Sequence, residues 1–491
     1  MEKQFTHYIN GECHQPSNGQ WIDSINPATG RVWAQIARGN ATDVDLAARA
    51  AARASEELTW RSNPSYRSEV LKAIALRLDR NYESLIDVEI NDNGKRKTEV
   101  KAQMSALSGW YRHFAELTNT DKIVELKTGL EGVTVTRDLI PFGVIGAITA
   151  WNSPLMIAAW KIAPALAGGN AVIVKPSELA SCSTVVFADM VGDLLPRGVL
   201  NVITGFGYEA GASLVENEYV RKITFTGSEV GGASVAATAA KHVKPTTLEL
   251  GGKSPQIVFE DADIENTLNG ILSGIFLSNG QSCVAGSRLI IHRTIHDSFV
   301  EKLKRRLSSL KIGDPHDETV NIGPIANEAQ LDKIVSMVNQ ARADGASVVA
   351  GGVKAEVKGF EEGYFYHPTI LIDVALNTQI WREEVFGPVL CVTKFDQVRE
   401  AIDLANNTDY GLAAGIWTSD EALAKSVSKQ INAGTVYINH YRSVNACVPV
   451  GGVKKSGYGR ELGPYAVEAF MQEKAIWTGE SKMADPFPDC S

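Results

Sequence analysis

Cys283 is the residue best suited to covalent chemistry, because a thiolate is a strong nucleophile. It lies in the segment 279–286, Asn-Gly-Gln-Ser-Cys-Val-Ala-Gly, where no bulky neighbour shields the sulfur from a ligand. A free cysteine is more commonly buried and inert, so the segment alone leaves a structural role open.

Glu249 is the second candidate, since it stands alone between Leu248 and Leu250. Burial disfavours the charged form of a carboxylate and raises its pKa, which suits a general base near neutral pH. The alternative is a structural carboxylate that is paired at the end of a strand.

Three further segments follow predicted strands and carry groups that bind nucleotides or stabilise charge. Lys175 and Glu178 could together hold ribose hydroxyls, and the turn at Gly227 and Ser228 precedes a helix whose free N–H groups could bind a phosphate. Asn152 could donate its amide to an oxyanion. In isolation, the first segment could equally be a solvated loop and Asn152 a residue that starts a helix.

Two glycine patterns bear on the kind of nucleotide. The segment 205–211 has one residue too many for Gly-x-Gly-x-x-Gly, and the sequence holds no Gly-x-x-x-x-Gly-Lys-Ser/Thr loop. ATP chemistry therefore has no support in the sequence.

The elements that must position these residues alternate between strands and helices from about residue 140 onward. Apolar runs predict strands at 144–149, 171–174, 199–204 and 222–226, with helices up to 166 and at 181–194. This alternation indicates a parallel sheet with right-handed crossovers, and therefore the α/β class. A second α/β region is predicted from 252 to 450, with strands at 256–259, 288–292, 389–395 and 435–438.

The flanking segments have a different texture. Residues 1–40 are typical of short strands and turns, and 42–120 are typical of helices, with Thr42 and Asp45 as the expected N-cap of the first helix. Residues 121–140 alternate polar and apolar side chains around Gly129 and Gly132, which predicts a hairpin.

The composition excludes several classes of function. The chain has 491 residues, 48 Lys and Arg against 57 Asp and Glu, a formal charge of −9 and 44% apolar residues, which is typical of two or three globular domains. The acidic balance disfavours nucleic acid and anionic membranes as partners. No apolar run reaches the roughly 18–20 residues of a membrane helix, and the N-terminus has no secretory pattern, so we expect a cytoplasmic protein.

The six cysteines and nine histidines are dispersed along the chain. No Cys-x-x-Cys pair and no zinc-like spacing occurs, so we expect neither a disulfide scaffold nor a metal site. A reducing compartment would keep Cys283 available as a thiolate.

Taken together and in this order, the motifs resemble those of the NAD(P)-dependent aldehyde dehydrogenase superfamily. The resemblance extends from about residue 8 to 480 and rests on Asn152 and the segments 175–178, 225–228, 249–252, 280–283, 384–388 and 451–460. It implies an α/β fold with a Rossmann-like cofactor domain at 1–120 and 141–251, a catalytic domain at 252–450, and a small β oligomerisation element at 121–140 and 471–491. It also implies a homodimer or homotetramer.

The resemblance assigns a role to each candidate residue. Cys283 is expected to be the nucleophile, Glu249 the general base, and Asn152, with the backbone N–H of Cys283, the oxyanion site. The cofactor is expected to be bound by Lys175, Glu178, Gly207, Gly227, Ser228, Trp151, Glu384 and Phe386. Because Glu178 would repel a 2′-phosphate, we expect NAD rather than NADP.

The implied reaction converts an aldehyde to an acid. A Cys283 thiohemiacetal loses hydride to the nicotinamide, and water activated by Glu249 hydrolyses the thioester that remains. Members that transfer the acyl group to coenzyme A generally lack a base at this position, so we expect hydrolysis. A CoA-acylating semialdehyde dehydrogenase, a thiol esterase and a non-catalytic binding protein on the same scaffold are the alternatives.

Three departures from the family pattern bear on the substrate. Ala150, Ser153 and Val450 stand where many members carry proline, an aromatic residue and phenylalanine. Fewer aromatic walls imply a roomier or more polar pocket, for which the candidate lining residues are Ser153, Met156, Trp160, Ser282, Val284, Tyr441 and Val450. We therefore expect a bulky, cyclic or heteroatom-bearing aldehyde, such as a semialdehyde or a hydroxylactone.

Overall fold

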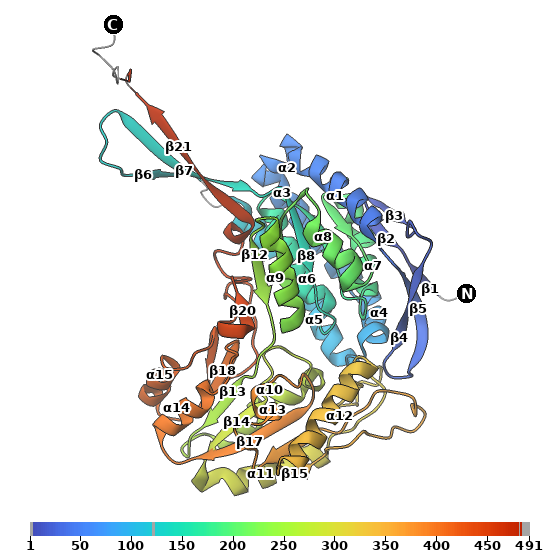
Figure 1. Cartoon of the computed structure of the whole chain (residues 1–491), viewed down its shortest axis with the longest axis vertical. Coiled ribbons are helices and arrows are strands. Elements are labelled where there is room, and N and C mark those ends of the chain that lie inside the picture. Colours follow the sequence, from blue (N-terminus) through green and yellow to red (C-terminus); the bar gives the residue numbers. More distant parts are fainter. Residues whose placement is uncertain (1–2, 120–122, 481, 484–491) are drawn as a thin grey trace.

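The computed structural model describes residues 3–119, 123–480 and 482–483. These residues form two lobes and a long β arm that projects from the first lobe (Figure 1). The first lobe is built on an eight-stranded sheet and the second on a seven-stranded sheet, and the arm is a three-stranded sheet. The observed fold is α/β, as the sequence predicts.

The sheet of the first lobe has the order β20-β12-β11-β8-β9-β10-β2-β3. Its five central strands are parallel, while β20, β2 and β3 are antiparallel to their neighbours. The bounds are β2 His7–Ile9, β3 Glu12–His14, β8 Val144–Ile148, β9 Ala171–Lys175, β10 Leu200–Val202, β11 Val220–Thr226, β12 Thr246–Glu249 and β20 Gly457–Tyr458. Every residue of β8 and β9 is buried, because helices cover both faces of a parallel sheet.

The helices of the first lobe come mainly from the segments predicted to be helical. They are α1 Ala41–Glu56, α2 Leu58–Arg61, α3 Pro64–Asn81, α4 Glu83–Asn93, α5 Lys97–Glu116, α6 Pro154–Ala167, α7 Cys182–Val191, α8 Ala212–Glu216 and α9 Glu229–Lys241, with short turns η1 Leu117–Asn119, η2 Gly192–Leu194 and η3 Gly207–Gly211. A small sheet of β1 Lys3–Phe5, β5 Arg31–Ala37 and β4 Trp21–Asn26 flanks them.

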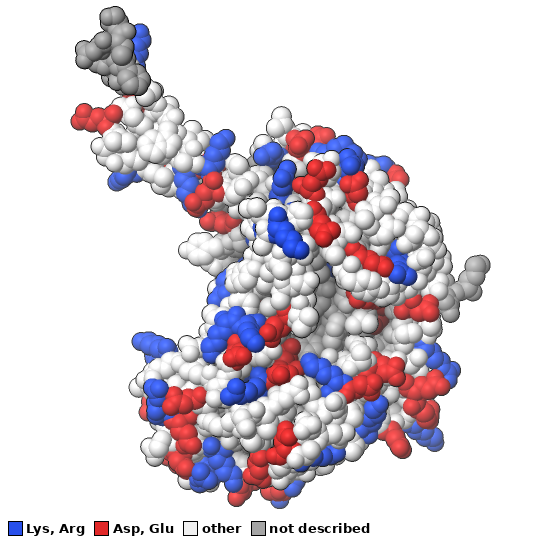
Figure 2. Space-filling model, in the orientation of Figure 1, with Lys and Arg blue, Asp and Glu red and all other residues white. Residues whose placement is uncertain are grey.

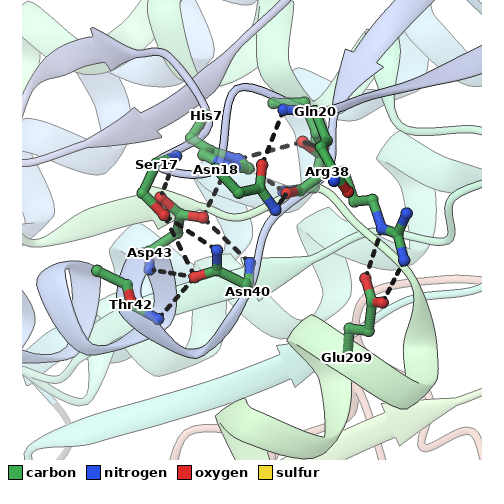
Figure 3. Close-up of polar contacts among 11 residues, drawn as sticks. His7, Ser17, Asn18, Gln20, Arg38, Asn40, Thr42, Asp43 and Glu209 are labelled. Atoms are coloured by element: carbon green, nitrogen blue, oxygen red, sulfur yellow. Dashed lines mark hydrogen bonds and ion pairs between the residues drawn. The ribbon is translucent and has the colours of Figure 1, made fainter.

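The first helix begins differently from the sequence prediction. Asn40, and not Thr42, is the N-cap of α1: its side chain accepts hydrogen bonds from the backbone N–H groups of Thr42 and Asp43, and Asp43 accepts from the N–H of Asn40 in return (Figure 3). Thr42 lies inside the first turn. Asn and Thr both cap helices, and here the extended backbone of Asn40 decides which one does so.

The second lobe has the strand order β15-β16-β17-β14-β13-β18-β19, parallel except at β15. Its strands are β13 Pro255–Val258, β14 Arg288–His292, β15 Ser347–Ala350, β16 Thr369–Ile372, β17 Val389–Phe395, β18 Ala413–Trp417 and β19 Thr435–Ile438. Its helices and turns are α10 Ile264–Phe276, η4 Leu277–Gly280, α11 Arg293–Ser308, α12 Glu328–Ala343, α13 Gln379–Arg382, α14 Val398–Asn406, α15 Glu421–Ser428 and η5 Lys454–Ser456. The turn η6 Glu468–Phe470 precedes β21, and Phe470 packs in the apolar core of the first lobe.

The arm joins segments that lie far apart in the sequence. The strands β6 Val124–Leu126 and β7 Val133–Pro141 form the antiparallel pair that the glycines at 129 and 132 predict, and β21 Met471–Gly479 pairs with β7 along its whole length. Residues 121, 122, 481 and 484–491 of the predicted oligomerisation element lie outside the described residues.

Charges of both signs are intermixed over both lobes on the face seen in Figure 2. Among the described residues, no group of three or more His, Cys, Asp or Glu side chains could hold a metal ion. No helix in the described part of the chain is long and apolar enough to cross a membrane.

Candidate active site

Four neighbouring parallel strands of the first lobe end at the same edge of the sheet, and each delivers candidate residues there. Asn152 follows β8, Lys175 ends β9, Ser228 follows β11, and Glu249 ends β12. The chain order reverses between β8 and β11, and the crevice beyond such a switch point is where open α/β sheets bind ligands.

A cavity of about 350 Å³ lies at this edge. It is lined by all eleven residues predicted for catalysis and for cofactor binding: Cys283, Glu249, Asn152, Lys175, Glu178, Gly207, Gly227, Ser228, Trp151, Glu384 and Phe386. Three of these, Cys283, Glu384 and Phe386, come from the second lobe, so both lobes form the cavity. A larger groove of about 700 Å³ lies against α11, on the outside of the second lobe, and contains none of these residues.

A strained loop delivers Cys283 to the cavity. Ser278 and Asn279 both have left-handed backbones, with φ of 52° and 54°, and a Cβ on Gly280 would lie 2.1 Å from the carbonyl oxygen of Gly387. The Asn279 side chain holds the loop, because it donates to the carbonyl of Pro324 at 2.7 Å. Left-handed backbones in non-glycine residues cost free energy and persist where packing enforces them, commonly at functional sites.

The environment of Cys283 opposes ionisation of its thiol. Burial, followed by the nearby carboxyl groups of Glu384 and Glu249, raises the pKa of Cys283 to about 12, against the opposing effects of the N–H of Val284 and the Arg442 guanidinium. The resting group is therefore the neutral thiol.

Glu249 is a buried carboxyl with few partners. It is 7% exposed, and its Oε1 has no hydrogen-bond partner among the described residues. Burial, followed by the charge of Glu461, holds its pKa well above the usual range, against the opposing charges of Lys161 and Arg460. The raised pKa makes the carboxylate form of Glu249 a stronger base, which suits a group that takes a proton from water.

Asn152 contacts the loop that carries Cys283. Its amide Nδ2 donates to the carbonyl oxygen of Gln281 at 2.9 Å, two residues before Cys283. An amide aimed at the nucleophile loop is suited to stabilise an oxyanion that forms at the sulfur-bound carbon.

The other end of the cavity fits a dinucleotide. The Lys175 ammonium pairs with Glu178 at 2.9 Å, and Ser228 caps α9 by accepting from the N–H of Gly231 at 3.1 Å. The first turn of this helix therefore presents further N–H groups to an anion. Oγ1 of Thr226, which also lines the cavity, is buried without a partner among the described residues, and so is free for a ligand.

Glu384 and the aromatic pair Trp151 and Phe386 complete the cavity between the lobes. Glu384 accepts from the N–H of Gly252 at 2.8 Å, and burial raises the pKa of Glu384 to about 7. The rings of Trp151 and Phe386 are nearly perpendicular, with centroids 5.1 Å apart, and Phe386 has a φ of 56°.

Two residues of α12, Gln330 and Lys333, also line the cavity and were not predicted. Gln330 donates to the carbonyl oxygens of Val385 and Phe386, and Lys333 donates to the carbonyl of Glu384. They hold the backbone of the loop that carries Glu384. They lie on a helix surface without a motif, so only the fold identifies them.

The seven residues predicted to line the substrate pocket lie outside the 350 Å³ cavity. Met156 and Val450 pack against the apolar cluster that contains Trp160, whose ring meets that of Trp110 at 5.7 Å. Tyr441 donates its hydroxyl to the carbonyl of Val284 at 2.9 Å, next to the nucleophile. Two serines, Ser153 and Ser282, are largely buried.

Comparisons with known proteins agree with this geometry. The model of the aldehyde dehydrogenase family matches residues 14–476. The chain is 39% identical to the chloroplastic betaine aldehyde dehydrogenase of Beta vulgaris over 96% of its own length and 95% of that protein, and 41% identical to the peroxisomal aminoaldehyde dehydrogenase 1 of Pisum sativum over 96% and 94%.

A solved structure of Staphylococcus aureus betaine aldehyde dehydrogenase in complex with NAD⁺ has the same fold. It superposes with a TM-score of 0.97 at 34% identity, over 99% of this chain and 96% of that one. The family match, the relatives and the fold agree across nearly the whole chain, and the protein therefore belongs to the aldehyde dehydrogenase family.

Proposed function

We propose that this protein oxidises an aldehyde to the free carboxylic acid with NAD, through a covalent intermediate on Cys283. The observation that carries this proposal is the convergence of Cys283, Glu249 and Asn152 on one cavity together with a set of side chains suited to a dinucleotide. Each of these groups comes from a different segment of the chain.

The side chains divide the chemistry among them. The Cys283 thiol gives its proton to a water molecule, its sulfur forms a bond to the aldehyde carbon, and the amide of Asn152 donates to the oxygen that becomes negative. Bound NAD supplies the acceptor for the hydride that leaves this carbon. Glu249 then takes a proton from a water molecule that attacks the Cys283 thioester, which releases the acid and restores the thiol.

The residues that would hold NAD are those at the dinucleotide end of the cavity. Lys175 and Glu178 are placed for ribose hydroxyls, the N–H groups after Ser228 for the pyrophosphate, and Glu384 with Phe386 for the nicotinamide side. NAD⁺ is bound in the Staphylococcus aureus relative, which supports this assignment. Glu178 also favours NAD over NADP, since its carboxylate would repel a 2′-phosphate.

The charged side chains near Cys283 bear on which class of aldehyde is the physiological substrate. Arg442 is left-handed, with φ 65°, and donates to the Ser273 carbonyl and the Ser278 hydroxyl on the elements before Cys283. It acts electrostatically on the thiol, and Lys95 acts on Arg442.

On the side of Cys283 where Arg442 and Lys95 lie, the facing carboxylates are Glu99 and Glu89, and burial raises the pKa of Glu89 to about 7. Glu384 and Glu249, which also act on the thiol, line the cavity. We therefore propose an aldehyde with a carboxylate or a neutral polar group, such as a semialdehyde or a hydroxylactone. The second candidate is a cationic aldehyde, as the names of the betaine aldehyde and aminoaldehyde dehydrogenases indicate for those relatives.

A panel of aldehydes followed by NADH absorbance tests both parts of this proposal. With NAD and no coenzyme A, we expect turnover, and a carboxylate-bearing semialdehyde should exceed betaine aldehyde in kcat/KM by at least about tenfold, or about 1.4 kcal/mol. A requirement for coenzyme A would support the CoA-acylating alternative, and absence of turnover on the whole panel a binding role. Preference for betaine aldehyde would reverse the substrate assignment alone.

We also propose that the arm assembles this chain into a homodimer or homotetramer. β21 is one of the two edge strands of the arm, and Trp477 on it is 61% exposed. An exposed strand edge with apolar side chains is suited to pairing with another copy. Light scattering should show an oligomer that Trp477→Lys weakens, whereas Val353→Lys, at a 52% exposed position in the second lobe, should not.

We also propose that the protein is located in the cytoplasm. Support comes from the five cysteines in the described part of the chain, which are all free. The names of the plant relatives place them in chloroplasts and peroxisomes, so localisation of a tagged full-length chain is the direct test.

A further inference from the structure

Two side chains from the end of α4 contact the backbone segment that carries Asn152, one on each side. The Asn93 amide donates to the carbonyl oxygen of Trp151 at 3.3 Å, and the Lys95 ammonium donates to the Ser153 hydroxyl at 2.7 Å. Asn152 itself makes one side-chain hydrogen bond, to Gln281. Its orientation therefore depends on how its neighbours are held.

The contacting residues are themselves fixed. Asn93 and Lys95 are 3% and 4% exposed, and the backbone N–H of Lys95 donates to the Asn93 side chain at 3.0 Å. Gly94 makes the sharp turn between them with φ 72°, and a Cβ there would lie 2.7 Å from Pro324. The Lys95 ammonium has a second acceptor in Gln103 of α5, at 2.9 Å.

Charge reinforces this arrangement. Lys95 faces Glu89 of α4 and Glu99 of α5 as well as Arg442, and burial lowers the pKa of Lys95 to about 8, which leaves it mainly protonated at neutral pH. Glu89 accepts from Ser183 at 3.0 Å and is influenced by the N–H of Leu155, at the start of α6. Burying an ammonium is costly unless it is paired and hydrogen-bonded. The hydrogen bonds of the Lys95 ammonium go to Ser153, just before α6, and to Gln103 of α5.

We propose that Lys95 is a positioning residue, which holds Ser153 so that the amide of Asn152 points at the oxyanion formed at Cys283. Asn93 holds the other side of the same segment through the carbonyl of Trp151. Lys95 does not touch the reacting atoms in this proposal and acts through Asn152. The inference rests on the oxyanion role proposed for Asn152.

A small displacement of an oxyanion donor lowers the rate of the chemical step more than it lowers ground-state binding. For Lys95→Met we therefore expect kcat to fall about ten- to a hundredfold, while KM for the aldehyde and the Kd for NAD change less than about threefold. A KM change with kcat intact would assign Lys95 to substrate binding and overturn the proposal.

Lys244→Met is the matched control. Lys244 also has a pKa that burial lowers to about 8, and its ammonium donates to the carbonyls of Val215 and Asn217, elsewhere in the first lobe. Loss of this partly buried ammonium should leave kcat within about twofold of the wild-type value. An equal loss of kcat in both variants would mean that removal of any such hydrogen-bonded lysine produces the effect, and would overturn the specific role.

A double-mutant cycle isolates the route of the effect. Asn152→Ala alone should lower kcat about 10²–10³-fold, and adding Lys95→Met should lower it by less than a further twofold. If the two losses multiply, Lys95 acts on something other than Asn152. If Asn152→Ala leaves kcat unchanged, the oxyanion role of Asn152 is rejected by that single variant, whatever the double variant shows.

Ser153→Ala provides the same test without removing a charge. This change deletes the hydroxyl that Lys95 holds and leaves Gln103 as an acceptor for the ammonium, so the fold should persist even if Lys95→Met does not fold. We expect a kcat loss like that of Lys95→Met, and no further loss in the Asn152→Ala background. Wild-type kcat in the Ser153→Ala variant would reject the proposed contact.

Discussion

The start of α1 and the cavity at the edge of the sheet each bury a carboxylate, and they treat it in opposite ways. Asp43 is 3% exposed and accepts hydrogen bonds from the N–H groups of Ser17 and Asn40 at 3.0 and 3.1 Å, with His7 at 3.7 Å (Figure 3). Glu249 is 7% exposed and leaves Oε1 without a partner among the described residues. The two carboxylates are buried to a similar degree, but they differ in the hydrogen bonds that they accept.

The pKa values differ in direction for this reason. Burial raises the pKa of Asp43, but its contacts with His7, Asn40 and Ser17 outweigh that effect and the pKa is lowered overall. At Glu249, burial acts together with Glu461, and the pKa is raised. A carboxylate whose oxygens are hydrogen-bonded stays ionised and stabilises the fold, whereas one that lacks hydrogen-bond partners can exchange a proton during a reaction.

The largest expected difference between the regions concerns Cys283, the nucleophile of the cavity. Cys283→Ala should lower NADH formation at least about a thousandfold while NAD binding survives, because the covalent intermediate cannot form. Cys391→Ala is the control, since this buried thiol lies in β17 and contacts the carbonyl of Ile380. Stopped-flow absorbance and a binding titration give both quantities, and substantial turnover in Cys283→Ala would reject the assigned nucleophile.

Glu249→Gln should separate the two halves of the reaction. The amide cannot accept a proton from water, so we expect one rapid equivalent of NADH per subunit and then turnover about 10²–10⁴-fold slower than wild type. The raised pKa of Glu249 also implies that wild-type kcat rises with pH through that pKa, above the range of an ordinary carboxyl group, since the base form increases in that direction.

Rapid-quench measurement of the burst, together with kcat from pH 6 to 9, checks this prediction. The variant should lose the Glu249 limb of the pH profile. A variant without a burst would place Glu249 before hydride loss rather than after it.

The sequence predicts the strands around the cavity well, for a physical reason. β8 and β9 are buried on both faces and so appear as continuous apolar runs, and their observed bounds each differ from prediction by one residue. β12, with the sequence Thr-Thr-Leu-Glu, is short and mostly polar, and was not predicted. β16, with the sequence Thr-Ile-Leu-Ile, was also not predicted, although it is apolar. The N-cap at Asn40 was missed because residue type alone does not distinguish it from Thr42.

The site divides in the same way. Residues at strand ends converge as the topology requires, and family motifs identify the loop of Cys283. Lys95 and Arg442 reach the site only through tertiary contacts of α4 and of the loop after β19, and neither lies in a motif that the sequence brings forward. The side chains that position a catalytic group, or set the charge around it, are therefore the part that the fold must supply.

Asp43→Asn should affect stability and not turnover, unlike the variants of the cavity. Loss of the charge weakens the bonds from Ser17 and Asn40, so we expect the free energy of unfolding at pH 7 to fall by about 1–3 kcal/mol. Because the pKa of Asp43 is lowered in the fold, its stabilisation is present above the unfolded value near pH 4 and is lost as pH falls through the folded value.

The wild-type and Asp43→Asn curves should therefore converge in acid. Denaturant unfolding followed by circular dichroism between pH 3 and 7 measures this. A kcat change above about twofold in Asp43→Asn would contradict the division between the two regions.

The smallest expected effect concerns the choice between NAD and NADP, for which one carboxylate of the cavity is compared with one that pairs with Arg38, just before α1. Glu178 and Glu209 are both carboxylates near the dinucleotide end of the cavity and both are paired, Glu178 with Lys175 and Glu209 with Arg38 (Figure 3). Only Glu178 lines the cavity.

Glu178→Gln removes the charge that would repel a 2′-phosphate and releases the Lys175 ammonium. The ratio of kcat/KM for NADP to that for NAD should therefore rise about five- to tenfold, or roughly 1 kcal/mol at this partly exposed position. Glu209→Gln should leave the ratio unchanged, because its carboxylate is directed to Arg38 and not to the ligand. An equal shift in both variants would mean that general electrostatics near the first lobe sets the preference, and that the position of Glu178 at the end of β9 has no special role.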